Sequence, residues 1–111
     1  MANLSDAVEL NSLSDTATLA VGHRCVLMAC RAINTTGAAA YVQLFDAAAI
    51  TDVVVGTTVA RWAVKSPTLD VSDGDGLPTD GLVFENGIVA ASTTSPTNGT
   101  GAIQHVRLGI W

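Results

Sequence analysis

The stretch that most constrains the fold is residues 34–62, NTTGAAAYVQLFDAAAITDVVVGTTVARW. Within it, residues 41–46 (YVQLFD) combine period-two alternation with aromatic and branched side chains, which is typical of a β-strand. Small residues end that strand, a valine run at 53–55 indicates a second, and a Gly-Thr-Thr turn leads into a third at 59–64. The stretch therefore predicts a piece of antiparallel sheet and carries no catalytic chemistry.

Two strands are expected before this stretch, and short turns connect the rest. Residues 16–21 predict a short strand, and residues 24–33 a long one that is apolar on both faces, as in a central strand or one packed on a neighbouring subunit. The Asn-Thr-Thr-Gly turn at 34–37 predicts a hairpin into the strand at 41–46.

The C-terminal third shows the same kind of pattern. Asn86-Gly87 stands between two apolar runs and predicts a hairpin with a type I′ turn over residues 81–91. A short strand is expected at 68–71, inside a Gly/Asp/Pro loop. The last strand, residues 103–111, alternates cleanly and is expected to face the core with every second side chain.

These elements predict an all-β chain: an antiparallel β-sandwich of seven to nine strands, jelly-roll-like or Ig-like, with an N-terminal extension. We expect one sandwich domain at residues 17–111 and an arm at residues 1–16, because the apolar residues of that segment are spaced too loosely to indicate a helix or a strand. The arm would dock on a neighbouring subunit or shell through Leu4, Val8, Leu10 and Leu13.

Composition indicates a protein that works in an assembly. Charged residues make up 14% of the chain, against roughly 25% in ordinary soluble domains, while 49% of the residues are apolar. Monomers rarely leave large apolar patches exposed, so we expect a homo-oligomer, with a trimer preferred and a dimer possible. An Ala-rich monomer is the alternative.

Charge and hydropathy argue against two classes of partner. The net charge of −5 disfavours binding to a nucleic-acid backbone or to an anionic membrane surface. The N-terminal residues lack the pattern of a secretory signal, and no apolar run is long enough to cross a bilayer. We therefore expect no nucleic-acid or membrane partner and a cytosol-like compartment.

The sequence offers no catalytic, cofactor or metal site. His23 and His105 have no accompanying nucleophile motif or ligand pair, so an enzyme is not expected. The acidic run at 70–76 lacks EF-hand spacing and is interpreted as a solvated turn. Cys25 and Cys30 are five apart in one strand, which predicts opposite faces and no bridge between them.

Four residues are candidates for an interaction surface. Arg61 and Lys65 share one strand face, with Trp62 on the core side, and Arg107 leaves the closing strand opposite its apolar row. These cations are expected to contribute to a basic patch, with Trp111 adding apolar area nearby. The alternative is that each cation pairs with a carboxylate of its own chain.

The order of segments also carries a resemblance. An Asn turn, YVQLFDAAA, a valine run, GTTVARW, a Gly/Asp/Pro loop, GLVFENGIVAASTT and a closing strand resemble small proteins encoded among the structural genes of tailed bacteriophages. The resemblance covers about residues 24–111. It brings no catalytic residues.

This resemblance implies a virion structural protein. The expected role is an outer capsid decoration, or cement, protein that binds and stabilises the shell of the major capsid protein and is made in the bacterial host cytoplasm. A tail or head-fibre component and a soluble carbohydrate-binding β-sandwich are the alternatives. The acidic charge fits the outer surface of a capsid, away from packaged DNA.

Overall fold

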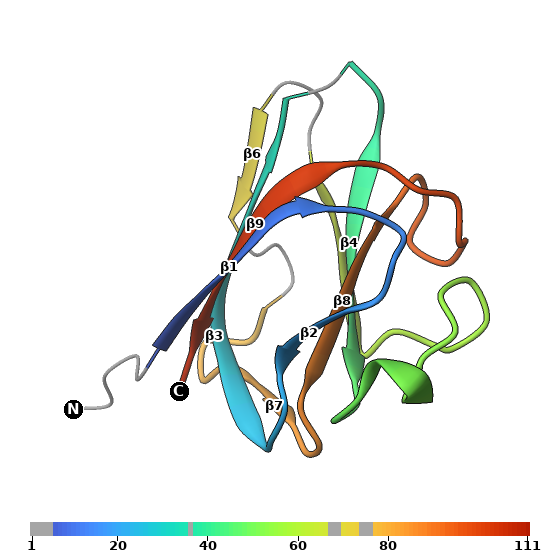
Figure 1. The fold of residues 1–111 in the computed structure, drawn as a ribbon. Helices are drawn as coiled ribbons and strands as arrows, with labels where there is room; N and C mark the ends of the chain where they lie inside the picture. The colour runs from blue at the N-terminus through green and yellow to red at the C-terminus, as the bar shows by residue number, and fades with distance from the viewer. Residues whose placement is uncertain (1–5, 36, 67–69, 74–76) are drawn as a thin grey trace.

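The strand that the sequence indicates most clearly, residues 41–46, lies inside one of two antiparallel sheets in the computed structural model (Figure 1). The structure describes residues 6–35, 37–66, 70–73 and 77–111, with the backbone alone for residue 6 and residues 70–73. The described elements are β1 (Asp6–Leu13), β2 (Thr18–Val21), β3 (Cys25–Asn34), β4 (Ala40–Asp46), the 3-10 helix η1 (Ile50–Asp52), β5 (Trp62–Ser66), β6 (Asp70–Asp73), β7 (Leu82–Phe84), β8 (Ile88–Thr93) and β9 (Gln104–Ile110). The prediction of an all-β sandwich is confirmed.

The order of the strands identifies the type of sandwich. Sheet A has the order β1-β9-β3-β6, with β7 also paired to β3, and sheet B has the order β2-β8-β4-β5. The first strand thus pairs with the last in sheet A, and the second pairs with the last but one in sheet B. This nested pairing of two sheets is the jelly-roll arrangement. Figure 1 shows β1 and β9 running side by side.

The core fills the space between the two sheets. Leu27 and Leu108 enter it from sheet A, Leu44 enters it from sheet B, and all three are fully buried. Trp62 packs half-buried against this core, on the face that the sequence predicts. β3 is the central strand that its two apolar faces indicate, because β9 pairs with one side and β6 and β7 with the other.

Sheet B has a second, smaller core on its outer face. The long connection from β4 to β5 folds back over that face, so every residue of β8 is buried. The valine run at 53–55 belongs to this connection and is not a strand, which corrects the sequence prediction: Val53 is buried against the sheet, whereas Val54 is 60% exposed. The buried members of this second core are Phe45, Ala47, Val53, Val89 and Ala91.

The two turn motifs assigned to hairpins instead carry the chain from one sheet to the other. The first motif follows β3 of sheet A, and the next strand, β4, belongs to sheet B; Asn86-Gly87 likewise lies between β7 of sheet A and β8 of sheet B. The type I′ turn is also wrong, because Gly87 has φ +145° and Asn86 has no positive φ. Turn residues specify a local reversal, but long-range pairing decides which sheet each strand joins.

The expected arm is wrong for residues 6–13, which form β1 at the edge of sheet A. Leu10 and Leu13 are both buried in the main core. Their spacing of three hides the strand period because the register shifts between them, where Ser12 adopts φ +56°. Such a bulge returns the chain to the same face one residue out of phase.

A second bulge changes the expected placement of the cysteines. The pairing of β3 with β9 shifts register between Leu27 and Ala29. Cys25 and Cys30 therefore both face the main core, not opposite faces. Both thiols are free, and a five-residue separation along a strand, about 16 Å, keeps them from bridging each other.

Candidate functional site

The outer faces of the two sheets differ in what covers them. The chain's own β4–β5 connection packs on sheet B, whereas the strands of sheet A turn a mixture of charged, small and larger apolar side chains outward. We call this open surface the sheet A face. Its described outward residues are Ala7, Glu9, Val26, Ala29, Arg31, Ile33, Val83, His105, Arg107, Gly109 and Trp111.

A charged row crosses four strands of sheet A. Glu9 of β1 stands opposite Arg107 of β9, which in turn stands opposite Arg31 of β3. Arg107 forms an ion pair with Glu9, and its Nε donates a 3.1 Å hydrogen bond to Glu9 Oε1. That hydrogen bond and the charge of Arg107 lower the pKa of Glu9. On the other side of Arg31 the register places Asp73 of β6, so the row has two neighbouring arginines at its centre and an acidic residue at each end.

A row of small residues lies next to the charged row. Ala7, Gly109 and Ala29 stand opposite one another across β1, β9 and β3. Because their side chains are minimal, the sheet is hollowed there, and Leu77 and Pro78 bound the hollow, which measures about 680 Å³. The sheet A face is thus a shallow groove beside a pair of arginines.

Trp111 ends this face at the side opposite the charged row. Its backbone N–H and C=O both bond to Val26 of β3, at 2.9 and 2.8 Å. Trp111 is nevertheless 53% exposed, so a fixed backbone presents a large amphipathic ring to the surroundings. Exposed Trp and Arg side chains are the residue types most often found at binding hot spots.

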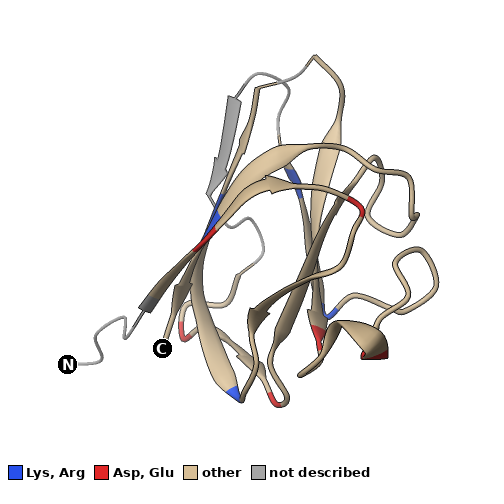
Figure 2. Ribbon diagram, viewed as in Figure 1, with Lys and Arg blue, Asp and Glu red and all other residues tan. Residues whose placement is uncertain are grey.

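The four predicted surface residues do not gather into one patch. Arg107 and Trp111 lie on the sheet A face, but Arg61 and Lys65 lie at β5, on the edge of sheet B. Arg61 Nε donates to Val83 O at 3.4 Å, which holds it at the side of the sandwich. Figure 2 shows the Lys and Arg residues at separate places on the ribbon.

The predicted arm residues have other roles. Val8 is half-buried and packs against the main core, as do the buried Leu10 and Leu13, so these three support the sandwich rather than a partner. Leu4 lies outside the described residues. Sequence reasoning did not select Arg31, because its position beside Arg107 depends on a strand register that no local pattern reveals.

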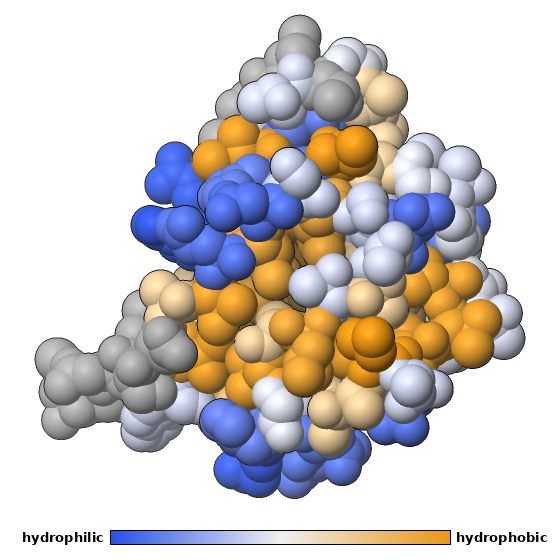
Figure 3. All heavy atoms as spheres, viewed as in Figure 1, coloured by the Kyte–Doolittle hydropathy of each residue, from blue (hydrophilic) through white to orange (hydrophobic). Residues whose placement is uncertain are grey.

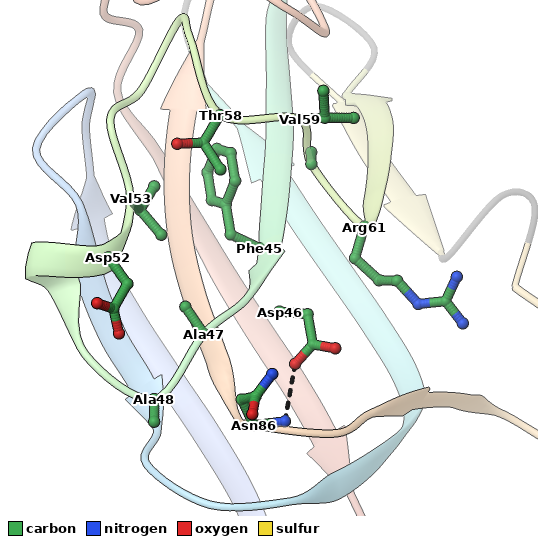
Figure 4. A pocket seen from close by; sticks show the side chains of 11 residues that line it. Phe45, Asp46, Ala47, Ala48, Asp52, Val53, Thr58, Val59, Arg61 and Asn86 are labelled. Carbon is green, nitrogen blue, oxygen red and sulfur yellow. Dashed lines mark hydrogen bonds between the residues drawn. The ribbon is translucent and has the colours of Figure 1, made fainter.

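A hollow of about 630 Å³ opens on the sheet B side (Figure 4). Phe45, Ala47 and Val53 form its apolar floor. Asp46 carries the polar part: its carboxylate accepts hydrogen bonds from the backbone N–H of Asn86 at 2.8 Å and of Glu85 at 3.2 Å. This bonding fixes the corner before β8.

Apolar side chains are exposed around that hollow. Ile50, Val54 and Val59 all lie in the β4–β5 connection and are 48%, 60% and 89% exposed. Figure 3 shows apolar atoms spreading over the lower right of this view, where the connection lies in Figure 1. Both outer faces of the sandwich therefore expose large apolar side chains that a partner could contact.

The described part of the chain shows no cluster of metal-binding side chains. Its residues include no group of three His, Cys, Asp or Glu side chains placed to hold a metal ion. The acidic run at 70–76 lies outside the residues whose side chains are described. Within residues 6–35, 37–66, 70–73 and 77–111, no helix is long and apolar enough to span a bilayer.

Comparison with known proteins gives no match: no family model, curated protein or solved structure is significantly similar to the chain. The surface geometry is therefore the basis for a functional proposal. Of the surfaces described, the sheet A face combines an open sheet, two adjacent arginines and an exposed tryptophan.

Proposed function

We propose that this chain is a non-enzymatic virion structural protein, an outer capsid decoration or cement protein that binds the shell of the major capsid protein through its sheet A face. The observation that carries the proposal is the open outer face of sheet A, which contrasts with the self-covered outer face of sheet B. In the part of the chain that the structure describes, no segment packs across the strands of this face as the β4–β5 connection does on sheet B, so a partner could reach it.

Charge supports this choice of face. The chain has a net charge of −5, and Arg31 and Arg107 stand side by side on the sheet A face. An acidic shell surface would be repelled by most of this molecule, and at the sheet A face its carboxylates would share the two arginines with Glu9 and Asp73, which flank them in the strand register. Such complementarity mainly sets orientation and on-rate, while Trp111 and the small-residue groove supply apolar contact area.

The fold is compatible with the proposal. Jelly rolls are common in viral capsid proteins, and they also occur in lectins, so the likeness of fold is an analogy only. A stable contact buries roughly 800 Å² on each partner. Assembly into a homo-oligomer, with a trimer preferred, would multiply that contact on a symmetric shell.

Binding to undecorated capsids tests the proposed face with a matched control. The double variant Arg31→Ser/Arg107→Ser removes two charges from the sheet A face, and Arg61→Ser/Lys65→Ser removes two charges from the edge of sheet B. We expect the first pair to weaken binding and flatten its salt dependence, and the second to have little effect. Trp111→Ala should weaken binding with the salt dependence unchanged.

The opposite ranking of the two double variants would assign docking to the edge of sheet B. Equal and undiminished binding by all variants would reject the sheet A face. At the level of the virion, the protein should co-purify with intact particles in an icosahedral copy number. A copy number of a few per particle would contradict a decoration role, and light scattering of the purified chain at 11.3 kDa at every concentration would contradict the oligomer.

A further inference from the structure

A buried side-chain amide on the sheet B side is only half satisfied. Gln43 of β4 is 1% exposed. Its Nε2 donates to Thr93 Oγ1 at 2.7 Å, to Asn98 O at 3.0 Å and to Ser95 O at 3.3 Å. Two of these partners are carbonyl oxygens, which fixes the orientation of the amide because an oxygen at that position would face acceptors. From the described residues, Gln43 Oε1 receives no hydrogen bond.

The other buried glutamine shows what a satisfied amide looks like in this molecule. Gln104 accepts a short hydrogen bond from Ser66 Oγ at its oxygen and donates from Nε2 to Ser92 Oγ at 2.9 Å. Buried polar atoms in native proteins nearly always have a partner, and a lone exception calls for an explanation. The unmatched acceptor of Gln43 is such an exception.

Gln43 lies in the wall of a hollow of about 360 Å³ on the outer face of sheet B. No charged or aromatic side chain contributes to that hollow, whose polar lining consists of one amide and three hydroxyl groups. Its described lining residues are Gln43, Gly56, Thr57, Thr58, Val59, Ala60, Ala63, Pro96 and Thr97.

The two loops that form the walls are fixed in place. A Cβ added to Gly56 would lie 2.9 Å from the backbone N of Gly99, so the loops meet backbone to backbone. The Nε2 bonds of Gln43 to Ser95 O and Asn98 O anchor the second loop to β4. A ligand would therefore meet a preformed hollow, which reduces the ordering required on binding.

We infer that this hollow is a binding site for an uncharged polyhydroxy ligand, a hexose unit of a neutral glycan, with one sugar hydroxyl donating to Gln43 Oε1. Hydroxyl groups both donate and accept, as do the threonine hydroxyls of the lining. The absence of charge in the lining gives no attraction to anions or cations, and the absence of an aromatic ring means recognition by hydrogen bonds rather than stacking.

The position of this hollow gives it a role separate from the proposed docking. It lies on the outer face of sheet B, on the opposite side of the sandwich from the sheet A face. A chain held to a shell through sheet A would present the hollow outward. The inference does not depend on shell binding, because the free protein carries the same site.

Titration of the ¹⁵N-labelled protein with single sugars tests the inference. Glucose, galactose, mannose and N-acetylglucosamine are added separately to tens of millimolar, and amide shifts are followed by NMR. We expect at least one sugar to give saturable shifts centred on the lining residues, including the side-chain amide of Gln43. Glycerol at equal hydroxyl concentration and trialanine are the comparison ligands and should give no saturable shifts there.

Two variants separate specific binding from a general solvent effect. Ala63→Leu fills the hollow from β5, at the position that stands opposite Gln43 in the strand register, and should weaken the sugar affinity about tenfold or more. Ala48→Leu makes the same change in the neighbouring 630 Å³ hollow and should leave the affinity unchanged. A dispersed spectrum confirms that each variant folds. No saturable shifts with any sugar, equal shifts with glycerol or trialanine, or unchanged affinity in Ala63→Leu would each overturn the inference.

Discussion

Replacement of Gly87 by alanine should be among the most destabilising single changes in this chain. Gly87 stands where the chain passes from sheet A to sheet B, with φ +145°. A Cβ at this position would lie 2.3 Å from Val21 O and 2.8 Å from Ala47 O. Both contacts are to backbone atoms that belong to neighbouring segments, so no side chain can swing away to relieve them.

The expected loss combines two terms. An alanine held at this φ costs about 1–3 kcal/mol. Relief of the closest contact needs a shift of about 1 Å, from 2.3 Å to the 3.4 Å of an ordinary contact, and overpacking of this kind costs about 1–3 kcal/mol. Together these give about 2–6 kcal/mol, a large part of the roughly 5–15 kcal/mol that keeps a domain folded.

Urea unfolding monitored by tryptophan fluorescence measures this loss, because Trp62 packs against the main core. Gly37→Ala is the matched control: a Cβ at Gly37 would meet no atom within 4 Å, and its φ is not positive. The control should be neutral or stabilise by about 0.4–1 kcal/mol. A loss below about 1 kcal/mol in Gly87→Ala, with an unchanged m-value, would refute the steric reasoning.

The remaining predictions concern the second core, the charged row and the thiols. Phe45→Ala should lower the free energy of unfolding by about 3–5 kcal/mol, because Phe45 is 1% exposed beneath the β4–β5 connection. A loss under about 1 kcal/mol in urea unfolding would show that the connection collapses into the cavity left by the phenyl ring. Arg107 lowers the pKa of Glu9 in the folded state, so the pair stabilises the fold above the ordinary glutamate pKa, and this contribution is lost as the pH falls through the lowered value. The Glu9→Gln variant should therefore show a slightly flatter decline of Tm on the acid side. Parallel curves of Tm against pH for the variant and the unchanged protein would argue against the pair. Cys25 and Cys30 are both buried, and burial raises the pKa of Cys25. Neither thiol should therefore react with an aromatic disulfide reagent until the protein is unfolded. Rapid labelling of the native protein would contradict this prediction.

The sequence predicts the strands better than it predicts their partners. Period-two alternation correctly indicates the strands at 41–46 and 103–111, because each has a buried face along its whole length. It fails at β1 and inside β3, where a bulge shifts the alternation by one residue. Asn86-Gly87 is a strong hairpin signal, yet its flanking strands pair with different neighbours. Sheet membership depends on pairing far along the chain, which short motifs do not encode.

The candidate surface was predictable only in part. Alternation in the closing strand correctly sets Arg107 apart from the apolar row, and it indicates that Trp111 stands on the same side. The grouping of Arg107 with Lys65 assumes that outward residues of different strands share a surface, but the two lie on different sheets. Arg31 becomes a neighbour of Arg107 only through the β3–β9 register.

The place of β9 in the jelly roll has a consequence for how the chain reaches its fold. β9 lies between β1 and β3 in sheet A, although it follows all the other described strands along the chain. During synthesis, β1 and β3 are therefore made before the strand that pairs with both of them. Unpaired apolar strand edges that are exposed until then are prone to aggregation. Sheet A closes only after residues 104–110 leave the ribosome, so we expect slow folding governed by contacts between distant parts of the chain.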